Sequence, residues 1–271
     1  MSSKEKKSVT ILTESQLSSR AFKDEAYEFY KELRKSQALY PLSLGALGKG
    51  WLISRYDDAI HLLKNEKLKK NYENVFTAKE KRPALLKNEE TLTKHMLNSD
   101  PPDHNRLRTL VQKAFTHRMI LQLEDKIQHI ADSLLDKVQP NKFMNLVDDY
   151  AFPLPIIVIS EMLGIPLEDR QKFRVWSQAI IDFSDAPERL QENDHLLGEF
   201  VEYLESLVRK KRREPAGDLI SALIQAESEG TQLSTEELYS MIMLLIVAGH
   251  ETTVNLITNM TYALMCHHDQ L

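Results

Sequence analysis

Residues 241–253 read MIMLLIVAGHETT, and the first eight of them are all apolar. A helix that is apolar on every side is normally buried inside a protein. Ser234 and Glu237 form a capping-box pattern before this run, and the helical pattern continues to about Ala263. About 30 residues at 1.5 Å per residue give roughly 45 Å, enough to cross a whole domain. The sequence therefore predicts a long helix buried in the centre of the fold.

The rest of the chain is also predicted to be mainly α-helical. Apolar residues recur three and four positions apart, and the 271 residues include only eight glycines. Residues 51–56 are aromatic and β-branched and predict a strand, followed by a helix from Asp57 or Asp58 to Leu63. The polar residues 71–99 predict a long surface loop, a kind of segment that often binds ligands. Other helices are predicted at 22–33, 119–138, 154–163, 168–183, 192–212 and 218–227, in one domain over residues 1–271 with a small N-terminal β-sheet.

Composition and charge limit the classes of partner. Lys and Arg number 35 against 40 Asp and Glu, and this net charge of −5 predicts neither nucleic acid nor an acidic membrane surface as a partner. The N-terminal residues 1–10 lack the apolar run of a signal peptide, and the apolar run 241–248 is short for a membrane span. The single cysteine, Cys266, is typical of a reducing compartment. We expect a cytoplasmic protein without a membrane anchor.

Residues 248–253, AGHETT, place polar groups where the long helix is predicted to be buried. Ala248 and Thr252 share one face, so Thr252 can bond the carbonyl of residue 248, and Gly249 allows close approach to the backbone. Together these residues predict a polar notch in an apolar wall. A kinked core helix, with back-bonded threonines and Glu251 in a salt bridge, is the alternative interpretation.

A second group of functional candidates follows two consecutive prolines, in residues 100–108, DPPDHNRLR. A helix is predicted to begin at about Pro102, which puts His104 and Arg108 on one face. Two nitrogen donors one turn apart suit the anionic edge of a cofactor, although an exposed basic helix would give the same pattern. Arg106 lies elsewhere on the helical wheel and is predicted to face solvent.

Both stretches resemble motifs of the cytochrome P450 family, the heme-thiolate monooxygenases. AGHETT is similar to the family's (Ala/Gly)-Gly-x-(Asp/Glu)-Thr-(Thr/Ser) signature, and DPPDHNRLR is similar to its Asp-Pro-Pro-(Glu/Asp)-His-x-Arg-Leu-Arg motif. Segments 51–58, 151–177 and 218–223 agree with the same family in the same order. The resemblance extends from about Phe22 to Leu271 and implies a cytochrome P450 fold.

The resemblance also implies a function, a heme cofactor and a role for each site residue. A cytochrome P450 hydroxylates an apolar organic substrate with dioxygen and electrons from a ferredoxin- or flavodoxin-like donor. Substrate would lie among residues 71–99, the helix 168–183 and the face 241–247. The implied roles are proton delivery to dioxygen for Glu251 and Thr252, heme-propionate binding for His104 and Arg108, a dioxygen groove for Ala248 and Gly249, and substrate contact for Leu244, Val247 and Ala248.

Two elements of the family pattern are missing from this chain. Neither the Glu-x-x-Arg helix nor the Phe-x-x-Gly-x-x-x-Cys-x-Gly loop, whose cysteine ligates iron, occurs in the sequence. Cys266 lacks the surrounding pattern, so the axial ligand is absent and no residue is predicted to bind a metal directly. We expect a truncated cytochrome P450 that is inactive alone. The alternative is a non-catalytic α-helical protein that binds a hydrophobic ligand or heme.

Three other patterns carry a simpler interpretation. His250-Glu251 is not followed by the second histidine of a zinc protease motif. The adjacent residues 266–268, CHH, cannot easily share one tetrahedral zinc ion. The basic run 209–213, RKKRR, is predicted to be the solvated C-terminal end of a helix, where the helix dipole favours positive charge.

Overall fold

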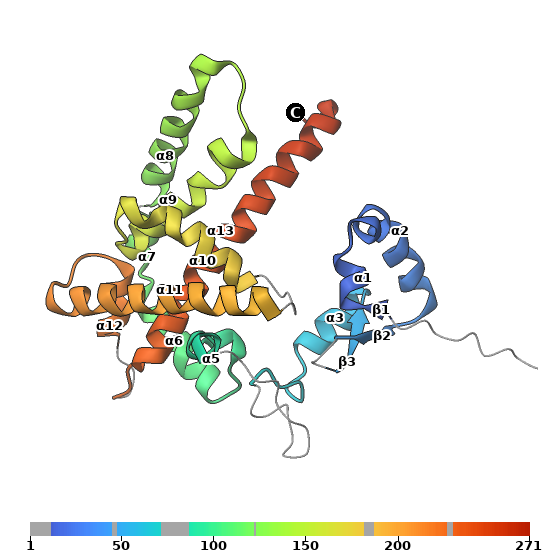
Figure 1. Ribbon diagram of the computed structural model, residues 1–271, viewed down its shortest axis with the longest axis horizontal. Helices are drawn as coiled ribbons and strands as arrows, with labels where there is room; N and C mark the ends of the chain where they lie inside the picture. Colours follow the sequence, from blue (N-terminus) through green and yellow to red (C-terminus); the bar gives the residue numbers. More distant parts are fainter. Residues whose placement is uncertain (1–11, 45–47, 72–86, 122, 182–186, 227–229) are drawn as a thin grey trace, which may run out of the picture. The chain divides into compact units, whose positions relative to one another are not determined.

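The computed structural model (Figure 1) describes residues 12–44, 48–71, 87–121, 123–181, 187–226 and 230–271. Contacts within the chain divide it into two compact units, Met1–Ala84 and Leu85–Leu271. The candidate site residues all belong to the second unit, and the expectation of one domain over residues 1–271 stays a prediction.

The first unit contains a small sheet with helices. β2 pairs parallel to β1 and antiparallel to β3, with Tyr40 opposite Leu52. The predicted strand is confirmed, although it begins and ends earlier than 51–56, and the following helix begins at Tyr56. The elements are β1 (Leu12–Thr13), α1 (Glu14–Ser18), α2 (Arg20–Ser36), β2 (Leu39–Ser43), β3 (Lys49–Ile53) and α3 (Tyr56–Leu63).

The second unit is built from helices, as the sequence predicts. Met119 and Val138, predicted to lie in one helix, belong to two, α7 and α8. The elements are α5 (Lys87–Leu92), η2 (Met96–Asn98), α6 (Asp103–Ala114), α7 (His117–Leu121), α8 (Leu123–Val138), η3 (Gln139–Asn141), the π-helix η4 (Leu146–Ala151), α9 (Pro153–Leu163), η5 (Leu167–Asp169), α10 (Arg170–Ile181), α11 (Pro187–Arg213), α12 (Leu219–Gln225), α13 (Thr235–Cys266) and η6 (His268–Gln270).

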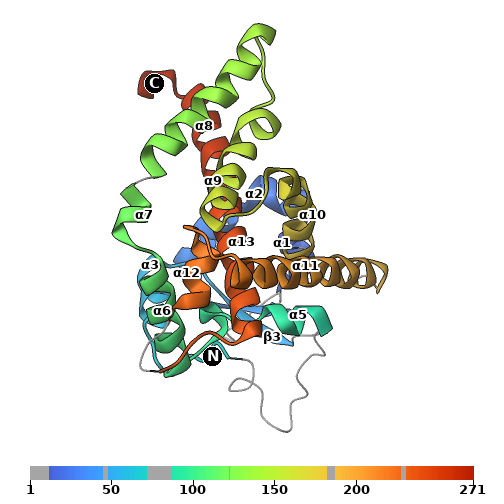
Figure 2. The same cartoon turned by 90° about the vertical axis from the view of Figure 1, so that its left-hand side faces the viewer.

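The helix α13 is the longest in the described part of the chain, and its first half forms the centre of the core. It begins with the predicted capping box, in which the Ser234 side chain accepts from the Glu237 amide and the Glu237 side chain accepts from the Ser234 amide. Residues 238–244 and Ile246 are buried. α13 contacts α5, η4, α9, α11 and α12, and Figure 2 shows it passing among them. The prediction of a central buried helix is correct for this half.

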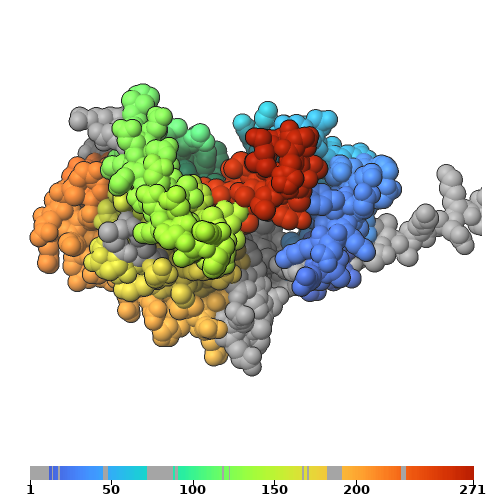
Figure 3. Space-filling model, turned by 90° about the horizontal axis from the view of Figure 1, so that it is seen from above, coloured from blue at the N-terminus to red at the C-terminus, as the bar shows by residue number. Residues whose placement is uncertain are grey.

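The second half of α13 does not share that burial. Leu256, Tyr262 and Met265 are 65%, 71% and 63% exposed, and in Figure 3 the end of α13, coloured red, lies at the surface. Within residues 1–271, the burial that the sequence predicts for this helix is therefore found up to Val254 and not beyond it. By length and hydropathy alone α13 could also cross a membrane, but its buried first half is what a core helix of a globular protein has.

The segment 71–99 is predicted to be a long surface loop, but its second part contains helical turns and buried residues. Residues 72–86 lie outside the described residues, while α5 and η2 form helical turns in the remainder. Leu92 is 3% exposed and His95 is 7% exposed. Leu92 belongs to the hydrophobic core. Apolar residues in this polar stretch therefore anchor it to α13, which the composition of the segment alone did not reveal.

Where α9 ends, Gly164 lies against a buried ion pair. Gly164 has φ of +70°, and a Cβ there would lie 2.5 Å from atoms of Asp218 and Lys211, so only glycine fits. Lys211 pairs with Asp218, and both side chains are largely buried. The basic run 209–213 does end α11, as predicted, but Lys211 is not solvated.

Candidate functional site

The AGHETT segment lies inside α13, which remains helical through it. The Oγ1 atom of Thr252 donates a hydrogen bond to the carbonyl oxygen of Ala248 at 2.8 Å, as predicted. Thr253 donates in the same way to Gly249 at 3.1 Å. Thr258 makes an equivalent bond to Val254 at 2.9 Å. A hydrogen bond from a threonine hydroxyl to the carbonyl four residues earlier is therefore common along this helix, and it does not by itself indicate a functional site.

The face of α13 that carries these residues passes from the interior to the surface. Leu244 is 8% exposed and belongs to the core, and Val247 packs partly buried against it. Ala248 and Thr252, one and two turns after Leu244, are exposed. On this face the polar segment therefore begins where α13 becomes exposed, whereas His250 on another face of the helix stays buried. Contact of Leu244, Val247 and Ala248 with substrate stays a prediction.

Gly249 lies against α9. A Cβ on Gly249 would be 3.3 Å from the Cδ1 atom of Ile159, tighter than an ordinary contact. The missing side chain therefore lets α9 approach α13 closely, which is a packing reason for glycine at this position. The predicted role of Gly249 in a groove for dioxygen is not tested by this contact and stays a prediction.

Glu251 is held by neighbours on its own helix. Its Oε1 atom accepts from the Nδ2 atom of Asn255 at 3.4 Å, and its Oε2 atom is 3.6 Å from Nε2 of His250. His250 is 1% exposed, its Nδ1 atom is 3.1 Å from the carbonyl oxygen of Ile246, and its ring meets Phe152 edge-on. The sequence associates His250 only with a zinc-protease motif, which is incomplete, whereas in the structure His250 is a buried neighbour of Glu251.

His104 and Arg108 are carried by α6, one turn apart as predicted. The helix begins at Asp103 after Pro102 and buries the face formed by Leu107, Leu110, Val111 and Ala114. His104 is partly exposed, and its Nδ1 atom is 3.3 Å from Oδ1 of Asn105. Arg108 is exposed, and no ion pair engages it among the described residues. Both side chains are thus available to an anionic group.

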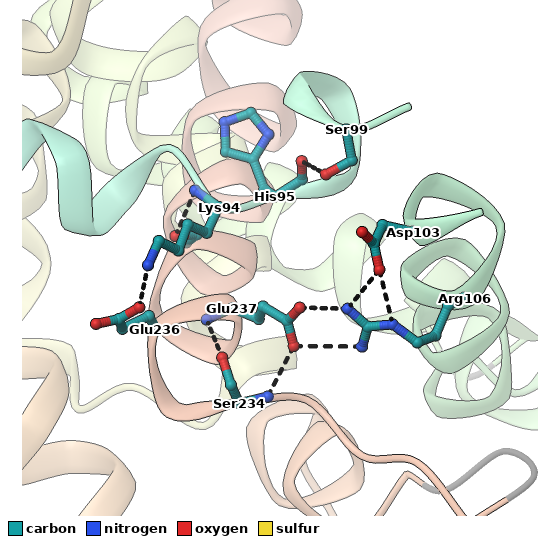
Figure 4. Close-up of polar contacts among 9 residues, drawn as sticks. Lys94, His95, Ser99, Asp103, Arg106, Ser234, Glu236 and Glu237 are labelled. Atoms are coloured by element: carbon teal, nitrogen blue, oxygen red, sulfur yellow. Dashed lines mark hydrogen bonds and ion pairs between the residues drawn. The ribbon is translucent and has the colours of Figure 1, made fainter. Parts of the chain in front are cut away.

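Arg106 is not solvent-facing, which corrects the sequence-based prediction. Figure 4 shows its guanidinium directed at Glu237 in the first turn of α13. Nη2 bonds Oε1 of Glu237, Nη1 donates to Oε2 at 3.3 Å, and Nε donates to Asp103 at 3.3 Å. The side chains of Arg106 and Glu237 are only 28% and 17% exposed. A partly buried, two-pronged ion pair therefore joins α6 to α13.

Glu237 has two tasks in this contact. Its Oε2 atom also accepts from the backbone amide of Ser234 at 2.8 Å, which completes the capping box. Burial alone would raise the pKa of Glu237, but its bonds to Arg106 and Ser234 and the charge of Arg106 outweigh burial and lower that pKa overall. The carboxylate is therefore kept ionised by the groups that it binds.

The same turn of α13 holds the segment before α6. Lys94 forms an ion pair with Glu236, about half exposed on both sides. The backbone amide of Lys94 donates to Oγ of Ser240 at 3.1 Å, and that hydroxyl donates to the carbonyl of Thr91 at 2.8 Å. Two segments that are far from α13 in sequence are thus fastened to its first two turns.

The predicted site residues form two separate groups. Ala248, Gly249, Glu251 and Thr252 share one stretch of α13, while His104 and Arg108 share one edge of α6. Within the described ranges, no hydrogen bond or ion pair joins the two groups. The structure also brings no three His, Cys, Asp or Glu residues together as a metal site in that part of the chain, and Cys266 is exposed.

Comparison with known proteins decides the family. The family model for cytochrome P450 matches residues 10–270. The chain belongs to the cytochrome P450 family. Family membership implies heme as the cofactor, and it confirms the resemblance that the AGHETT and DPPDHNRLR motifs indicated.

Individual cytochromes P450 agree over most of this chain. The polyketide biosynthesis cytochrome P450 PksS of Bacillus subtilis is 42% identical over 237 residues, 87% of this chain and 56% of PksS. Cytochrome P450 107B1 of Saccharopolyspora erythraea is 40% identical over 258 residues, 93% of this chain and 62% of that protein.

Solved structures of cytochromes P450 agree equally well. The structure of PksS matches with a TM-score of 0.81 and 38% identity, covering 93% of this chain and 62% of PksS. The myxobacterial P450 CYP267B1, in complex with myristic acid, matches with a TM-score of 0.80 and 38% identity over 88% of this chain and 60% of that chain. The chain thus spans about three fifths of the length of the P450s that it matches.

The residues present fit the propionate edge of heme. Heme carries carboxylates on one edge of an apolar ring, and an imidazole and a guanidinium are suitable donors for carboxylates. Arg106 is occupied by Glu237, whereas Arg108 and His104 are exposed or partly exposed on the other edge of α6. The chemistry of this donor set therefore agrees with the cofactor that the family implies.

Proposed function

We propose that this protein is a heme-dependent monooxygenase that hydroxylates an apolar organic substrate. The observation that carries the proposal is the position of Glu251 and Thr252 on a long helix of a cytochrome P450, where both side chains are accessible while the neighbouring His250 is buried. When bound, heme supplies the reduction of dioxygen and the transfer of one oxygen atom.

In this proposal the residues of α6 bind the cofactor. Arg108 would hold one heme propionate through its guanidinium, and His104 would donate to a propionate from its imidazole. Neither group has to leave another charged partner in the described part of the chain to do so. Ala248 and Gly249, small residues on α13, would leave room for dioxygen.

Glu251 and Thr252 would hold and move the protons that oxygen reduction consumes. The Thr252 hydroxyl gives its hydrogen to the Ala248 carbonyl, so its oxygen can accept a hydrogen bond from water or from a protonated group. Glu251 is partly exposed and can exchange protons with solvent at Oε2, beside His250. A proton could thus pass from solvent through Glu251 to the exposed side of Thr252.

The substrate, the electron donor and the compartment are also part of the proposal. Leu244, Val247 and Ala248, residues 87–99 and α10 would frame an apolar substrate, and the complex of CYP267B1 with myristic acid supports that class of ligand. A ferredoxin- or flavodoxin-like protein would donate the electrons in the cytoplasm. Cys266, exposed at the end of α13, does not match the family's ligand loop, so it is not proposed to bind the heme iron.

Carbon monoxide binding tests this function. The heme-loaded full-length protein, reduced and exposed to carbon monoxide, should absorb at the position typical of thiolate ligation. Residues 1–271 alone should lack that band, because they lack the cysteine loop. Cys266→Ser in the full-length protein is the matched control and should keep the band. A full-length protein that binds heme without the thiolate band would contradict monooxygenase function and favour a non-catalytic heme-binding protein.

A further inference from the structure

The contact between Arg106 and Glu237 restrains α6 in a way that its apolar packing cannot. The buried face of α6, formed by Leu107, Leu110, Val111 and Ala114, contacts the core through apolar side chains. Such contacts are non-directional, so they specify the roll of a helix about its axis less sharply than a directed bond does. A guanidinium bonded to a carboxylate through two nitrogens fixes an orientation as well as a distance.

The helical geometry relates this restraint to the predicted heme anchors. At about 100° per residue, Arg106 lies roughly 200° around α6 from His104 and from Arg108. The buried face lies between them, with Arg106 at one edge and the His104–Arg108 pair at the other. Fixing the edge at Arg106 therefore fixes the direction in which His104 and Arg108 point.

The carboxylate that holds Arg106 is itself held in place. Glu237 accepts from the backbone amide of Ser234 at 2.8 Å within the capping box of α13. Its side chain is 17% exposed. Little side-chain entropy remains to be lost when Arg106 binds, so this pair restrains α6 more strongly than an exposed surface pair could.

We propose that Glu237 is a positioning residue for the cofactor, acting through Arg106 to fix the roll of α6 and hence the direction of His104 and Arg108. The inference rests on the proposed role of those two residues in binding heme. Glu251 lies 14 residues after Glu237, about 21 Å along α13. One helix therefore supports both the anchor of the cofactor and the residues proposed to handle protons.

The test measures heme loss from the loaded full-length protein to excess apomyoglobin, well below the unfolding temperature of each variant. Glu237→Gln should keep the capping box, because glutamine serves there too, but it loses the ionic bond to Arg106. We expect roughly tenfold faster heme loss, as for other supporting partners of a ligand group. Arg106→Gln should match it, and the double variant should lose heme no faster than either single variant.

Two variants on the same turn of α13 are matched controls. Glu236→Gln removes the exposed ion pair with Lys94 and should leave heme loss unchanged. Ser234→Ala removes the hydroxyl that caps the Glu237 amide but keeps the backbone amide that binds the Glu237 carboxylate. It should lower Tm while leaving heme loss unchanged, which a purely structural role of Glu237 would not allow.

The outcomes separate this inference from the proposed function. If heme loss rises in proportion to the fall in Tm across Ser234→Ala, Glu236→Gln and Glu237→Gln, the positioning role is wrong. If His104→Ala and Arg108→Ala speed heme loss and Glu237→Gln does not, only this inference fails. If His104→Ala and Arg108→Ala leave heme loss unchanged, both fail. Should Glu237→Gln not fold, Arg106→Lys keeps the charge without the two-pronged bond and should still speed heme loss.

Discussion

The Nε2 atom of His250 lies 3.6 Å from the Oε2 atom of Glu251, and the other ring nitrogen of His250 faces the carbonyl oxygen of Ile246 at 3.1 Å. The buried imidazole of His250 thus lies next to the solvent-exposed carboxylate of Glu251. The pair can be ionic only when both ring nitrogens carry hydrogen.

His250→Phe should lower the stability of the protein slightly and should impair the function proposed for Glu251. Phenylalanine keeps a ring against Phe152 but loses both nitrogens, and the lost hydrogen bond should cost about 1 kcal/mol in the free energy of unfolding. Because Glu251 loses a neighbour, product formed per electron pair should also fall. Asn255→Ala, which removes the other partner of Glu251 from an exposed position, should cost less than about 0.5 kcal/mol. Unchanged stability and coupling in His250→Phe would show that His250 does not support Glu251.

Larger residues at position 249 should separate α13 from α9. A Cβ there would be 3.3 Å from Ile159, so Gly249→Val should destabilise the protein by about 1–3 kcal/mol through overpacking. Ile159→Ala in the same chain should recover part of this loss. At Gly217 a Cβ would meet no atom within 4 Å, so Gly217→Ala is the control and should change urea unfolding little. Equal effects at the two glycines would contradict close packing at Gly249.

His95 should make stability depend on pH. Burial lowers the pKa of His95 from 6.5 to about 4, and its Nδ1 atom has no hydrogen-bond partner in the described part of the chain. The unfolded chain binds a proton more readily than the folded protein, so this contribution is fully present above pH 6.5 and is lost as the pH falls toward 4. Between about pH 7.5 and about pH 5 the loss should be on the order of 2 kcal/mol.

Urea unfolding at these two pH values measures this contribution of His95. His95→Gln should remove most of the difference between them, whereas His117→Gln, at an exposed position, should not. An undiminished pH dependence in His95→Gln would show that other groups cause it.

Local features of the fold could be predicted from sequence, and features that depend on distant partners could not. The capping box of Ser234 and Glu237 and the bond from Thr252 to Ala248 involve residues three and four positions apart, so the sequence pattern contains them. Arg106 and Glu237 are 131 positions apart. A helical wheel places Arg106 off the buried face of α6 but cannot reveal a carboxylate on another helix.

The burial of individual segments also could not be predicted reliably from the sequence. An apolar run predicts a buried helix, yet Leu256 and Tyr262 are exposed, because burial depends on which segments pack against a helix. Conversely, the polar composition around Leu92 and His95 hid the contacts of this segment with α13. The candidate site residues were identified by the resemblance of two motifs to the cytochrome P450 family. The family match supports this resemblance, while the role of each residue stays a prediction.

The role proposed for the AGHETT segment is measured by the coupling of electron use to product formation in Thr252→Ala. The full-length, heme-loaded protein would be supplied with NADH, a ferredoxin reductase and a ferredoxin, with myristic acid as the test substrate. Thr258→Ala, which removes another back-bonded threonine of α13, is the matched control. Thr252→Ala should divert electrons to hydrogen peroxide and lower product per NADH by roughly tenfold or more, while Thr258→Ala should couple normally. Normal coupling in Thr252→Ala, in a protein that oxygenates the substrate, would contradict the role given to the AGHETT segment.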